Sequence, residues 1–252
     1  MKVFLTGASS GIGEALARHY AGQGATLGLV ARRAELLQAL KASLGVPAET
    51  YPCDVRDPAA MNAAAASFIA RHGVPDVVIA NAGVSIGNLT EHAADLEVFR
   101  ELLEINVLGL PVTFHPFLEP MRARGSGTLV GIASVAGLRG LPGATAYSAS
   151  KAAAIRYLEG LRVELRGTGV AVTTICPGYI ATAMTRRNPY TMPFIIPADE
   201  AARRFARVIA ARSSYAVVPW QMAIAGRILG VLPNWLFDRV AVKAGRKPRR
   251  GD

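Results

Sequence analysis

The sequence predicts an α/β fold: a doubly wound parallel sheet of seven strands with helices on both faces, in three αβα layers. Short apolar runs alternate with amphipathic stretches from the first residues to about residue 218. A glycine-rich turn follows the first run directly, and no segment rich in Pro, Gly and Ser divides the alternation. A strict alternation of this kind is typical of parallel strands joined by helices, so we expect one domain over residues 1–218.

The expected elements follow one another along the chain. We expect strands at the short apolar runs 3–6, 26–31, 48–52, 77–80, 127–132, 170–175 and 215–218. We expect helices at the amphipathic stretches near 11–23, 34–44, 58–72, 95–120, 147–166 and 198–212. Pro111 has no N–H to donate to the Val107 carbonyl, so the long helix over 95–120 should be irregular there.

Length and composition are those of a globular, soluble protein. The chain has 252 residues, of which 51% are hydrophobic, and this is enough for a substantial core. No apolar run is long enough to span a bilayer, and the first strand begins too early for a cleavable signal peptide. Cys53 and Cys176 lack metal-ligand or CxxC spacing, so we expect reduced thiols and a cytoplasmic location.

The net charge of +10 indicates an anionic partner, such as a phosphorylated cofactor, acidic lipid or nucleic acid. Much of the excess lies in the last ten residues, and a terminal basic run is usually a solvated, disordered end. Aromatic residues are not interleaved with the basic ones and no nucleic-acid motif is present, so we expect no nucleic-acid partner. The four histidines are scattered without ligand spacing, so we expect no metal site.

The first expected strand runs into a glycine-rich turn, Thr6-Gly7-Ala8-Ser9-Ser10-Gly11-Ile12-Gly13. Glycines allow a tight turn and let a pyrophosphate approach the N-terminus of the next helix, where free N–H groups favour anions. The spacing of these glycines differs from the Gly-x-Gly-x-x-Gly dinucleotide fingerprint. Because the turn directly follows the first strand, a nucleotide-binding role is favoured over a merely structural one.

The second expected strand ends at Ala31 and is followed at once by Arg32 and Arg33. Folds that bind NAD place an acidic residue here, against the ribose 2′-hydroxyl, and this chain has none. Guanidinium groups bind a 2′-phosphate in a bidentate manner, so the two arginines predict NADP(H). The alternative is a solvated start to the next helix, which explains Arg33 more easily than Arg32.

Tyr147 and Lys151 are four residues apart, about one helical turn, so on a helix they share one face. A cation beside a phenol favours the phenolate and lowers the pKa of the tyrosine toward working pH. Tyr147 is therefore a candidate proton donor and acceptor for a carbonyl or alcohol oxygen. The spacing alone is common on solvated helices, so its weight comes from the glycine-rich turn and from Ser134 upstream.

In this order, the motifs resemble those of the short-chain dehydrogenase/reductase family, over about residues 2–218. The resemblance implies a Rossmann-type fold and a nicotinamide dinucleotide cofactor. The implied cofactor-binding residues are Gly7, Ser9, Ser10, Gly11, Ile12 and Gly13 at the pyrophosphate, Arg32 and Arg33 at the 2′-phosphate, Asp54 and Val55 at the adenine, Asn81, Ala82 and Gly83 at the ribose, Tyr147 and Lys151, and Pro177, Gly178, Ile180 and Thr182 at the nicotinamide.

The same resemblance implies a catalytic tetrad of Asn106, Ser134, Tyr147 and Lys151. Ser134 can donate a hydrogen bond to the substrate carbonyl oxygen and stabilise charge that develops there. Tyr147 passes that oxygen a proton, while Lys151 lowers the tyrosine pKa and can bond the ribose hydroxyls. Asn106 needs a local break in its helix to hold a water that refills the proton relay. Ala133 stands where the family often carries a second serine, which is a minor departure.

Residues 183–198 correspond to the variable substrate lid of the family and are markedly apolar in this chain. The lid could close over a hydrophobic substrate, or it could pack onto the protein core, and the sequence favours neither interpretation over the other.

Residues 219–252 form an appendage: an apolar stripe broken by Pro233, followed by the basic end. It suits packing between the subunits of a homodimer or homotetramer, which the resemblance implies, or contact with an anionic membrane surface. Packing is favoured because Pro233 interrupts any long amphipathic helix, and membrane contact stays open.

We therefore expect an NADP(H)-dependent oxidoreductase that interconverts a carbonyl and a secondary alcohol, acting as a reductase on a hydrophobic substrate. An NADP-linked alcohol dehydrogenase is the alternative within this class, because hydride transfer is reversible. A catalytically silent NADPH-binding scaffold or regulator is disfavoured, because all four tetrad residues are present. A peripheral membrane enzyme that acts on a lipid is a further alternative.

Overall fold

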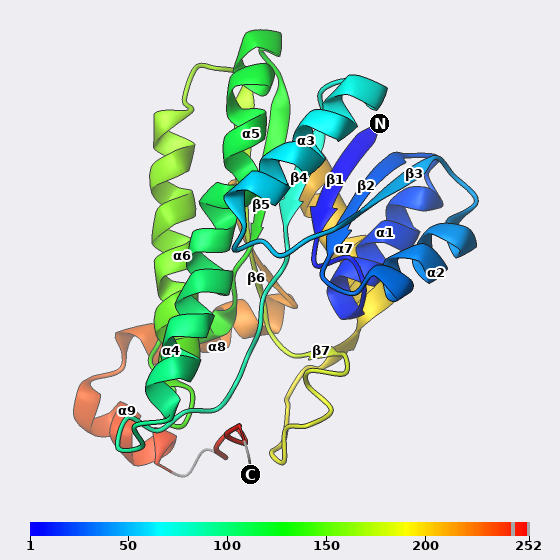
Figure 1. Ribbon diagram of the computed structural model, residues 1–252. Coiled ribbons are helices and arrows are strands. Elements are labelled where there is room, and N and C mark those ends of the chain that lie inside the picture. Colours follow the sequence, from blue (N-terminus) through cyan, green and yellow to red (C-terminus); the bar gives the residue numbers. More distant parts are fainter. Residues whose placement is uncertain (243–244, 251–252) are drawn as a thin grey trace.

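The computed structural model describes residues 1–242 and 245–250, and a parallel sheet forms its centre (Figure 1). Seven strands lie in the order β3-β2-β1-β4-β5-β6-β9, each parallel to its neighbours. They are β1 (Lys2–Thr6), β2 (Thr26–Ala31), β3 (Ala48–Pro52), β4 (Val77–Ala80), β5 (Gly127–Ile132), β6 (Val170–Pro177) and β9 (Tyr215–Val218). The predicted doubly wound sheet is confirmed, and every predicted strand is found within two residues of its expected ends.

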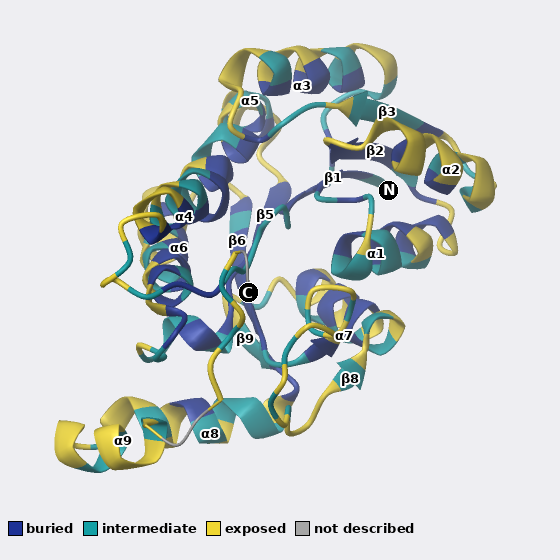
Figure 2. Cartoon of the chain, turned by 60° about the horizontal axis from the view of Figure 1, so that its bottom comes forward, coloured by how far each residue is buried: buried dark blue, intermediate teal, exposed yellow. Residues whose placement is uncertain are grey.

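Helices cover both faces of the sheet, and each face has its own core (Figure 2). The helices of the first face are α1 (Gly11–Ala21), α2 (Ala34–Leu44) and α7 (Ala198–Ala210), and those of the second are α3 (Pro58–His72), α5 (Gly109–Arg124) and α6 (Thr145–Glu164). In β1, Val3 and Leu5 lie in the first core and Phe4 lies in the second. This division follows because successive side chains of a strand point to opposite faces.

The helix expected over 95–120 is interrupted at Asn106. Helix α4 (Asp95–Leu103) continues into a π-helical turn at Glu104–Leu108, after which α5 begins. The irregularity expected near Pro111 is therefore present, as a wider turn just before the proline, which has no N–H to continue the regular helical pattern.

Two short strands, β7 (Ile180–Ala181) and β8 (Ile196–Pro197), pair in parallel and hold the two ends of the apolar loop between them. Met184, Phe194 and Ile195 of this loop are exposed. At these positions the loop is not tucked onto the core, and its apolar side chains face solvent beside the carboxyl ends of the strands.

The appendage after β9 begins with two helices, α8 (Trp220–Val231) and α9 (Asn234–Ala241), which Pro233 separates. Helix α8 packs closely against Leu138 at Gly226, where an added Cβ would lie 2.5 Å from Leu138 Cδ1. Trp220, Ile228 and Trp235 are more than half exposed. Within the described part of the chain, no helix has the length and apolar character needed to cross a membrane. Packing of this appendage between subunits stays a prediction.

Residues 245–250, here named the strap, return to the body of the protein beside α4 (Figure 1). The backbone N–H of Gly87 donates to the carbonyl of Pro248 at 3.0 Å. Arg249 forms an ion pair with the buried Asp95, with Nε 2.8 Å from Oδ2, and Arg250 pairs with Glu101. The expectation of a solvated, disordered basic end is wrong for Arg249 and Arg250, because carboxylates of α4 bind their guanidinium groups. Arg246 is exposed, as expected, and Lys243 of the same basic run lies outside the described residues.

Candidate active site

A cleft of about 410 Å³ lies along the carboxyl ends of the strands, where open α/β sheets bind their ligands. The predicted site residues that line this cleft are Gly7, Ser9, Ser10, Gly11, Ile12, Arg32, Arg33, Asp54, Val55, Asn81, Ala82, Gly83, Ser134, Tyr147, Lys151, Pro177, Gly178, Ile180 and Thr182. Gly13 and Asn106 lie outside the lining, and both contact residues that belong to it.

The glycine-rich turn is packed so closely that side chains are excluded at two of its positions. Gly7 has a φ of +67°, and a Cβ there would lie 2.8 Å from the Cα of Ala82. A Cβ on Gly13 would lie 2.1 Å from the carbonyl oxygen of Gly7. Asn81 fixes the same turn, because its Nδ2 donates to the carbonyl of Thr6 at 3.1 Å. The turn thus presents backbone to the cleft, as a pyrophosphate site at a helix N-terminus requires.

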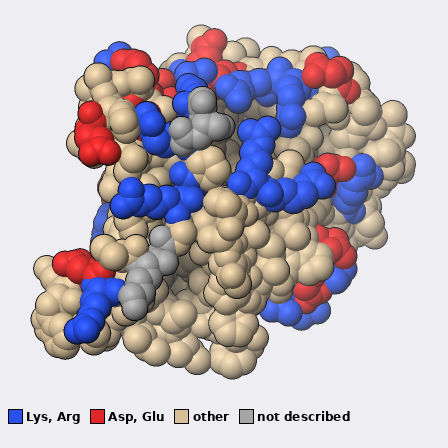
Figure 3. Space-filling view, turned by 90° about the horizontal axis from the view of Figure 1, so that it is seen from below, with Lys and Arg blue, Asp and Glu red and all other residues tan. Residues whose placement is uncertain are grey.

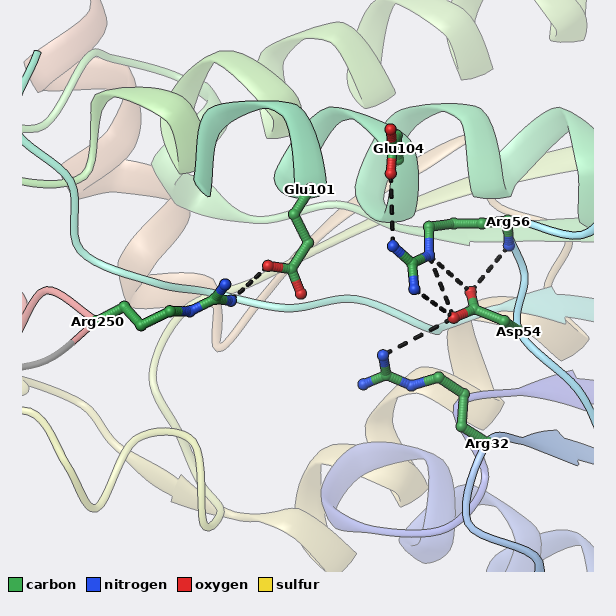
Figure 4. Close-up of polar contacts among 6 residues, drawn as sticks. All are labelled: Arg32, Asp54, Arg56, Glu101, Glu104 and Arg250. Atoms are coloured by element: carbon green, nitrogen blue, oxygen red, sulfur yellow. Dashed lines mark hydrogen bonds and ion pairs between the residues drawn. The ribbon is translucent and has the colours of Figure 1, made fainter. Parts of the chain in front are cut away.

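The two arginines after β2 reach different partners at one end of the cleft. Arg33 donates from Nη2 to the hydroxyls of Ser9 at 3.0 Å and Ser10 at 2.9 Å, which joins it to the glycine-rich turn. Arg32 lies 3.8 Å from a carboxylate oxygen of Asp54 and is more than half exposed (Figure 4). Two guanidinium groups and two hydroxyls therefore gather where the second strand ends, and this donor set suits a phosphate.

Asp54 is bound more tightly by Arg56 than by Arg32. The Arg56 guanidinium lies 2.8 Å from Asp54 Oδ2, and it extends to Glu104 at 3.5 Å (Figure 4). Hydrogen bonding from Arg56 lowers the pKa of the Asp54 carboxyl. Asp54 therefore stays ionised at neutral pH. The Arg56 guanidinium bridges Asp54 and Glu104, and so joins the loop after β3 to the π-helical turn.

The segment after β6 is held from both sides. The N–H of Gly178 donates to the carbonyl of Val218 at 2.8 Å, and that of Thr182 donates to the hydroxyl of Thr185 at 2.9 Å. Thr185 in turn donates to the carbonyl of Ile180 at 2.6 Å. The methyl group of Thr182 lies 3.2 Å from the position of a Cβ on Gly11. The predicted nicotinamide segment therefore lies directly against the glycine-rich turn.

Tyr147 lies at the centre of a cluster of hydroxyl groups. Its phenol interacts with the hydroxyls of Ser134 and Ser85, and its half-buried ring lines the cleft. Burial raises the pKa of Tyr147, and the two serine hydroxyls oppose this effect. The expectation of a lowered tyrosine pKa is wrong for the chain as described, because desolvation exceeds the opposing contributions.

Lys151 explains part of this difference. Its ammonium lies 5.9 Å from the centre of the Tyr147 ring and donates to the carbonyl of Ile132 at 2.9 Å. Burial lowers the pKa of Lys151 to about 8. The ammonium is thus held by the strand backbone, beside the phenol and facing Gly83 across the cleft, where a Cβ would lie 3.5 Å from Nζ.

The side chain of Asn106 forms hydrogen bonds with two segments next to the site. Its Oδ1 accepts from the N–H of Val84 at 2.9 Å, and its Nδ2 donates to the carbonyl of Val84 at 2.9 Å and to the hydroxyl of Ser150 at 3.0 Å. The side chain therefore joins the loop after β4 to the helix that carries Tyr147. These contacts assign the Asn106 side chain to positioning, and a role in holding water through its backbone stays a prediction.

Residues 1–192 match the model of the family described as short chain dehydrogenase. This chain is a short-chain dehydrogenase. It is 40% identical to an uncharacterized oxidoreductase of Myxococcus xanthus, over 94% of each chain. It is 33% identical to a putative ketoacyl reductase of Streptomyces coelicolor, over 90% of this chain and 94% of the relative. A solved variant of actinorhodin polyketide ketoreductase with NADPH superposes with a TM-score of 0.79 at 30% identity, covering 86% and 95% of the two chains.

Family membership fixes the class of chemistry. This short-chain dehydrogenase is an oxidoreductase that interconverts a carbonyl and an alcohol on a small molecule, with a nicotinamide cofactor. The residues of the cleft fit that cofactor, because the closely packed glycine-rich turn leaves backbone N–H groups for a pyrophosphate. No cluster of three or more His, Cys, Asp or Glu side chains is placed to hold a metal ion within residues 1–242 and 245–250.

The site of this short-chain dehydrogenase contains three residues that the sequence did not indicate. Ser85 shares the hydroxyl cluster of Tyr147. Tyr190 of the apolar loop lies close enough to Tyr147 for that phenol to contribute, after burial and Tyr179, to the raised pKa of Tyr190. Lys247 of the strap donates to the Ser85 hydroxyl. Ser85 could have been suspected, because it follows the Asn81-Ala82-Gly83 segment by two residues. No sequence signal joins Lys247 to the site.

Proposed function

We propose that this short-chain dehydrogenase is an NADPH-dependent reductase that converts a hydrophobic ketone or aldehyde into its alcohol. The observation that carries the proposal is the position of Tyr147, whose phenol interacts with the Ser134 hydroxyl and whose ring lies close to the Lys151 ammonium in the lining of the cleft. A phenol and a hydroxyl at one point can both reach a carbonyl oxygen, one as the acid and one as a hydrogen-bond donor.

The choice of NADPH rests on the donors at the end of β2. Arg33 is already joined to Ser9 and Ser10, so a 2′-phosphate bound there would meet a guanidinium and two hydroxyls on one side. Arg32 provides a second guanidinium on the other side, and the Asp54 carboxylate competes for it from 3.8 Å. The similar ketoreductase that was solved with NADPH agrees with this preference.

Three side chains of the cleft have distinct roles in the proposed reduction. When bound, the dinucleotide supplies the hydride from its nicotinamide ring. Ser134 donates a hydrogen bond to the substrate oxygen and stabilises the negative charge that develops on it. Tyr147 donates the proton, and Lys151 beside it stabilises the resulting phenolate. Because burial raises the pKa of Tyr147, the phenol is protonated at neutral pH, and this state supports the direction of reduction.

A hydrophobic substrate is supported by the loop between β7 and β8. Met184 lines the cleft, and Phe194 and Ile195 farther along the loop are exposed. Exposed apolar side chains beside a cleft gain free energy when they cover an apolar ligand, by about 25 cal/mol for each Å² removed from water. The loop is therefore suited to close over the apolar part of a substrate.

The proposal is tested by titrating the purified protein with NADPH and with NADH, followed by nicotinamide fluorescence, and then adding apolar ketones and aldehydes to the complex. We expect tight binding of NADPH and its oxidation by members of the panel. Tight binding of NADH alone would contradict the cofactor choice. Failure of the complex to reduce any carbonyl on a broad panel would contradict the reductase assignment.

Arg33→Ala should weaken NADPH binding by about tenfold or more and change NADH binding by less than about twofold. The expected size is that of a lost charge-assisted hydrogen bond, about 1.5–3 kcal/mol. Arg32→Ala should also weaken NADPH binding more than NADH binding, but with a smaller effect, because the Arg32 guanidinium is shared with the Asp54 carboxylate. Dissociation constants for both nucleotides provide the measurement.

The matched control is Arg100→Ala, which removes an exposed arginine from α4 outside the cleft lining. This variant should bind both nucleotides as the parent does. Equal losses of NADPH and NADH binding in Arg33→Ala would show that the 2′-phosphate is held elsewhere.

A further inference from the structure

The strap brings a lysine to the substrate side of the proposed proton donor. Lys247 donates from Nζ to the Ser85 hydroxyl, and its ammonium lies 5.3 Å from the centre of the Tyr147 ring. The Ser85 hydroxyl in turn interacts with the phenol of Tyr147. The Lys247 ammonium is therefore one hydroxyl group away from the phenol, although the two residues come from opposite ends of the fold.

Contacts on both sides of Lys247 hold the strap in place. After Lys247, the Pro248 carbonyl accepts from Gly87, and Arg249 pairs with the buried Asp95. Before it, Gly245 packs closely against the ring of Tyr190, at 3.0 Å from Cγ for an added Cβ. The strap thus spans from the apolar loop to α4, and Lys247 lies between these two anchors.

The ammonium of Lys247 lacks the partner that a buried cation usually has. Arg249 binds Asp95, and Arg250 binds Glu101 (Figure 4). In the described part of the chain, no carboxylate forms an ion pair with Lys247. Burial lowers the pKa of Lys247 to about 8, so the charged form predominates at pH 7. A partly buried charge without a counter-ion is costly, and an anionic ligand would remove that cost.

The face of the molecule that carries the strap is also positively charged. Figure 3 looks onto this face and shows Lys and Arg side chains gathered across it, with acidic side chains mainly toward its edges. A field of this sign attracts anions toward the cleft and raises their rate of association.

We propose that Lys247 binds an anionic group of the substrate, a carboxylate or a similarly charged oxyanion. The substrate is then an oxo acid, whose carbonyl lies at Tyr147 and Ser134 and whose acid group lies at Lys247. The inference rests on the proposed function for the carbonyl end, and it makes the strap a part of substrate recognition. It also refines the expectation of a hydrophobic substrate, because the apolar loop covers the chain and Lys247 binds the charged end.

The first test compares 4-oxooctanoate with its methyl ester as substrates for the NADPH complex at pH 7. We expect kcat/KM to be about tenfold or more higher for the acid, the size of a charge-assisted hydrogen bond. Lys247→Gln should remove this preference by lowering kcat/KM for the acid alone. Lys247→Arg should restore it in part, because the charge returns on a similar side chain.

Arg246→Gln is the matched control, since it removes the same charge from an exposed neighbour in the strap. This variant should keep the preference of the parent for the acid. If Lys247→Gln lowered kcat/KM equally for the acid and the ester, the inference would be overturned. Such a result would show that Lys247 acts on Tyr147 and not on the acid group of the substrate. A parent enzyme that reduces the ester as well as the acid would overturn it too.

The second test needs no turnover. Octanoate and octanamide, which differ chiefly in charge, are titrated calorimetrically into the parent and into Lys247→Gln, each with NADPH and without it. We expect octanoate to bind the parent at least about tenfold more tightly than octanamide, and the two to bind Lys247→Gln alike. Equal affinities in the parent would overturn the inference even if the enzyme reduced ketones well. Selective octanoate binding by a protein that reduced no carbonyl would support it while the proposed function failed.

Discussion

Tyr147→Phe should lower kcat by about 1,000-fold and leave the dissociation constant for NADPH within about twofold of the parent value. The substitution removes only the phenolic oxygen, and the half-buried ring remains in place. The lost oxygen is the proposed proton donor, so the substrate oxygen would have to take its proton from water. The measurement is steady-state kinetics with a ketone that the parent enzyme reduces, together with a fluorescence titration of NADPH.

Tyr157→Phe, on the same helix ten residues on, is the matched control. Tyr157 is partly buried, packs against the second core and is absent from the cleft lining. The Tyr157→Phe variant should keep the kcat of the parent. Normal turnover by Tyr147→Phe would remove this residue as the acid and would leave the hydroxyls of Ser134 and Ser85 as the remaining candidates.

Gly13→Ala should disrupt the cofactor site more strongly than any change to a lining side chain outside the catalytic group. The new Cβ would lie 2.1 Å from the Gly7 carbonyl oxygen and 2.7 Å from Asn81 Nδ2, so either the turn or the helix must move. Overpacking of this kind costs about 1–3 kcal/mol of stability. We expect a lower denaturation midpoint, and NADPH binding weakened by about tenfold or more because the backbone donors are displaced.

Gly160→Ala provides the contrast for this experiment. Gly160 is an exposed residue within α6, and no other atom lies within 4 Å of the position of an added Cβ. Alanine should raise stability there by up to about 1 kcal/mol, because glycine is the poorer helix former. NADPH binding should not change. If Gly13→Ala bound NADPH as the parent does, the close packing of the turn would not be needed for the cofactor.

Much of the fold could be predicted because its signals are local. Each strand is a short apolar run, and the alternation with amphipathic stretches predicts parallel pairing without any knowledge of distant contacts. Even the interruption at Asn106 has a local cause, since Pro111 cannot donate to the Val107 carbonyl. The glycine-rich turn and the two arginines after β2 follow from the same logic, because they come directly after strands whose carboxyl ends meet at one edge. Most of the other lining residues were implied by the family resemblance of the motifs.

The features that the sequence did not indicate depend on contacts across the chain. Ser85 and Lys247 are 162 residues apart, and no periodicity or spacing joins them. The basic end was expected to be solvated, because composition alone does not show that Asp95 and Glu101 of α4 are placed to receive it. The raised pKa of Tyr147 is also non-local, because it depends on how deeply the ring is buried and not on the spacing to Lys151.

The position of the strap has a kinetic consequence. Within the described residues, the strap contributes nothing to the lining of the cleft along the strand ends, so the nucleotide can enter and leave past the glycine-rich turn without disturbing it. The substrate side is different, because Lys247 lies there between the anchors at Tyr190 and Asp95. If Lys247 binds the acid group as proposed, we expect the Arg249–Asp95 pair, which anchors the strap, to influence how fast the product leaves. The maximal turnover rate would then depend on a contact remote from the reacting carbonyl.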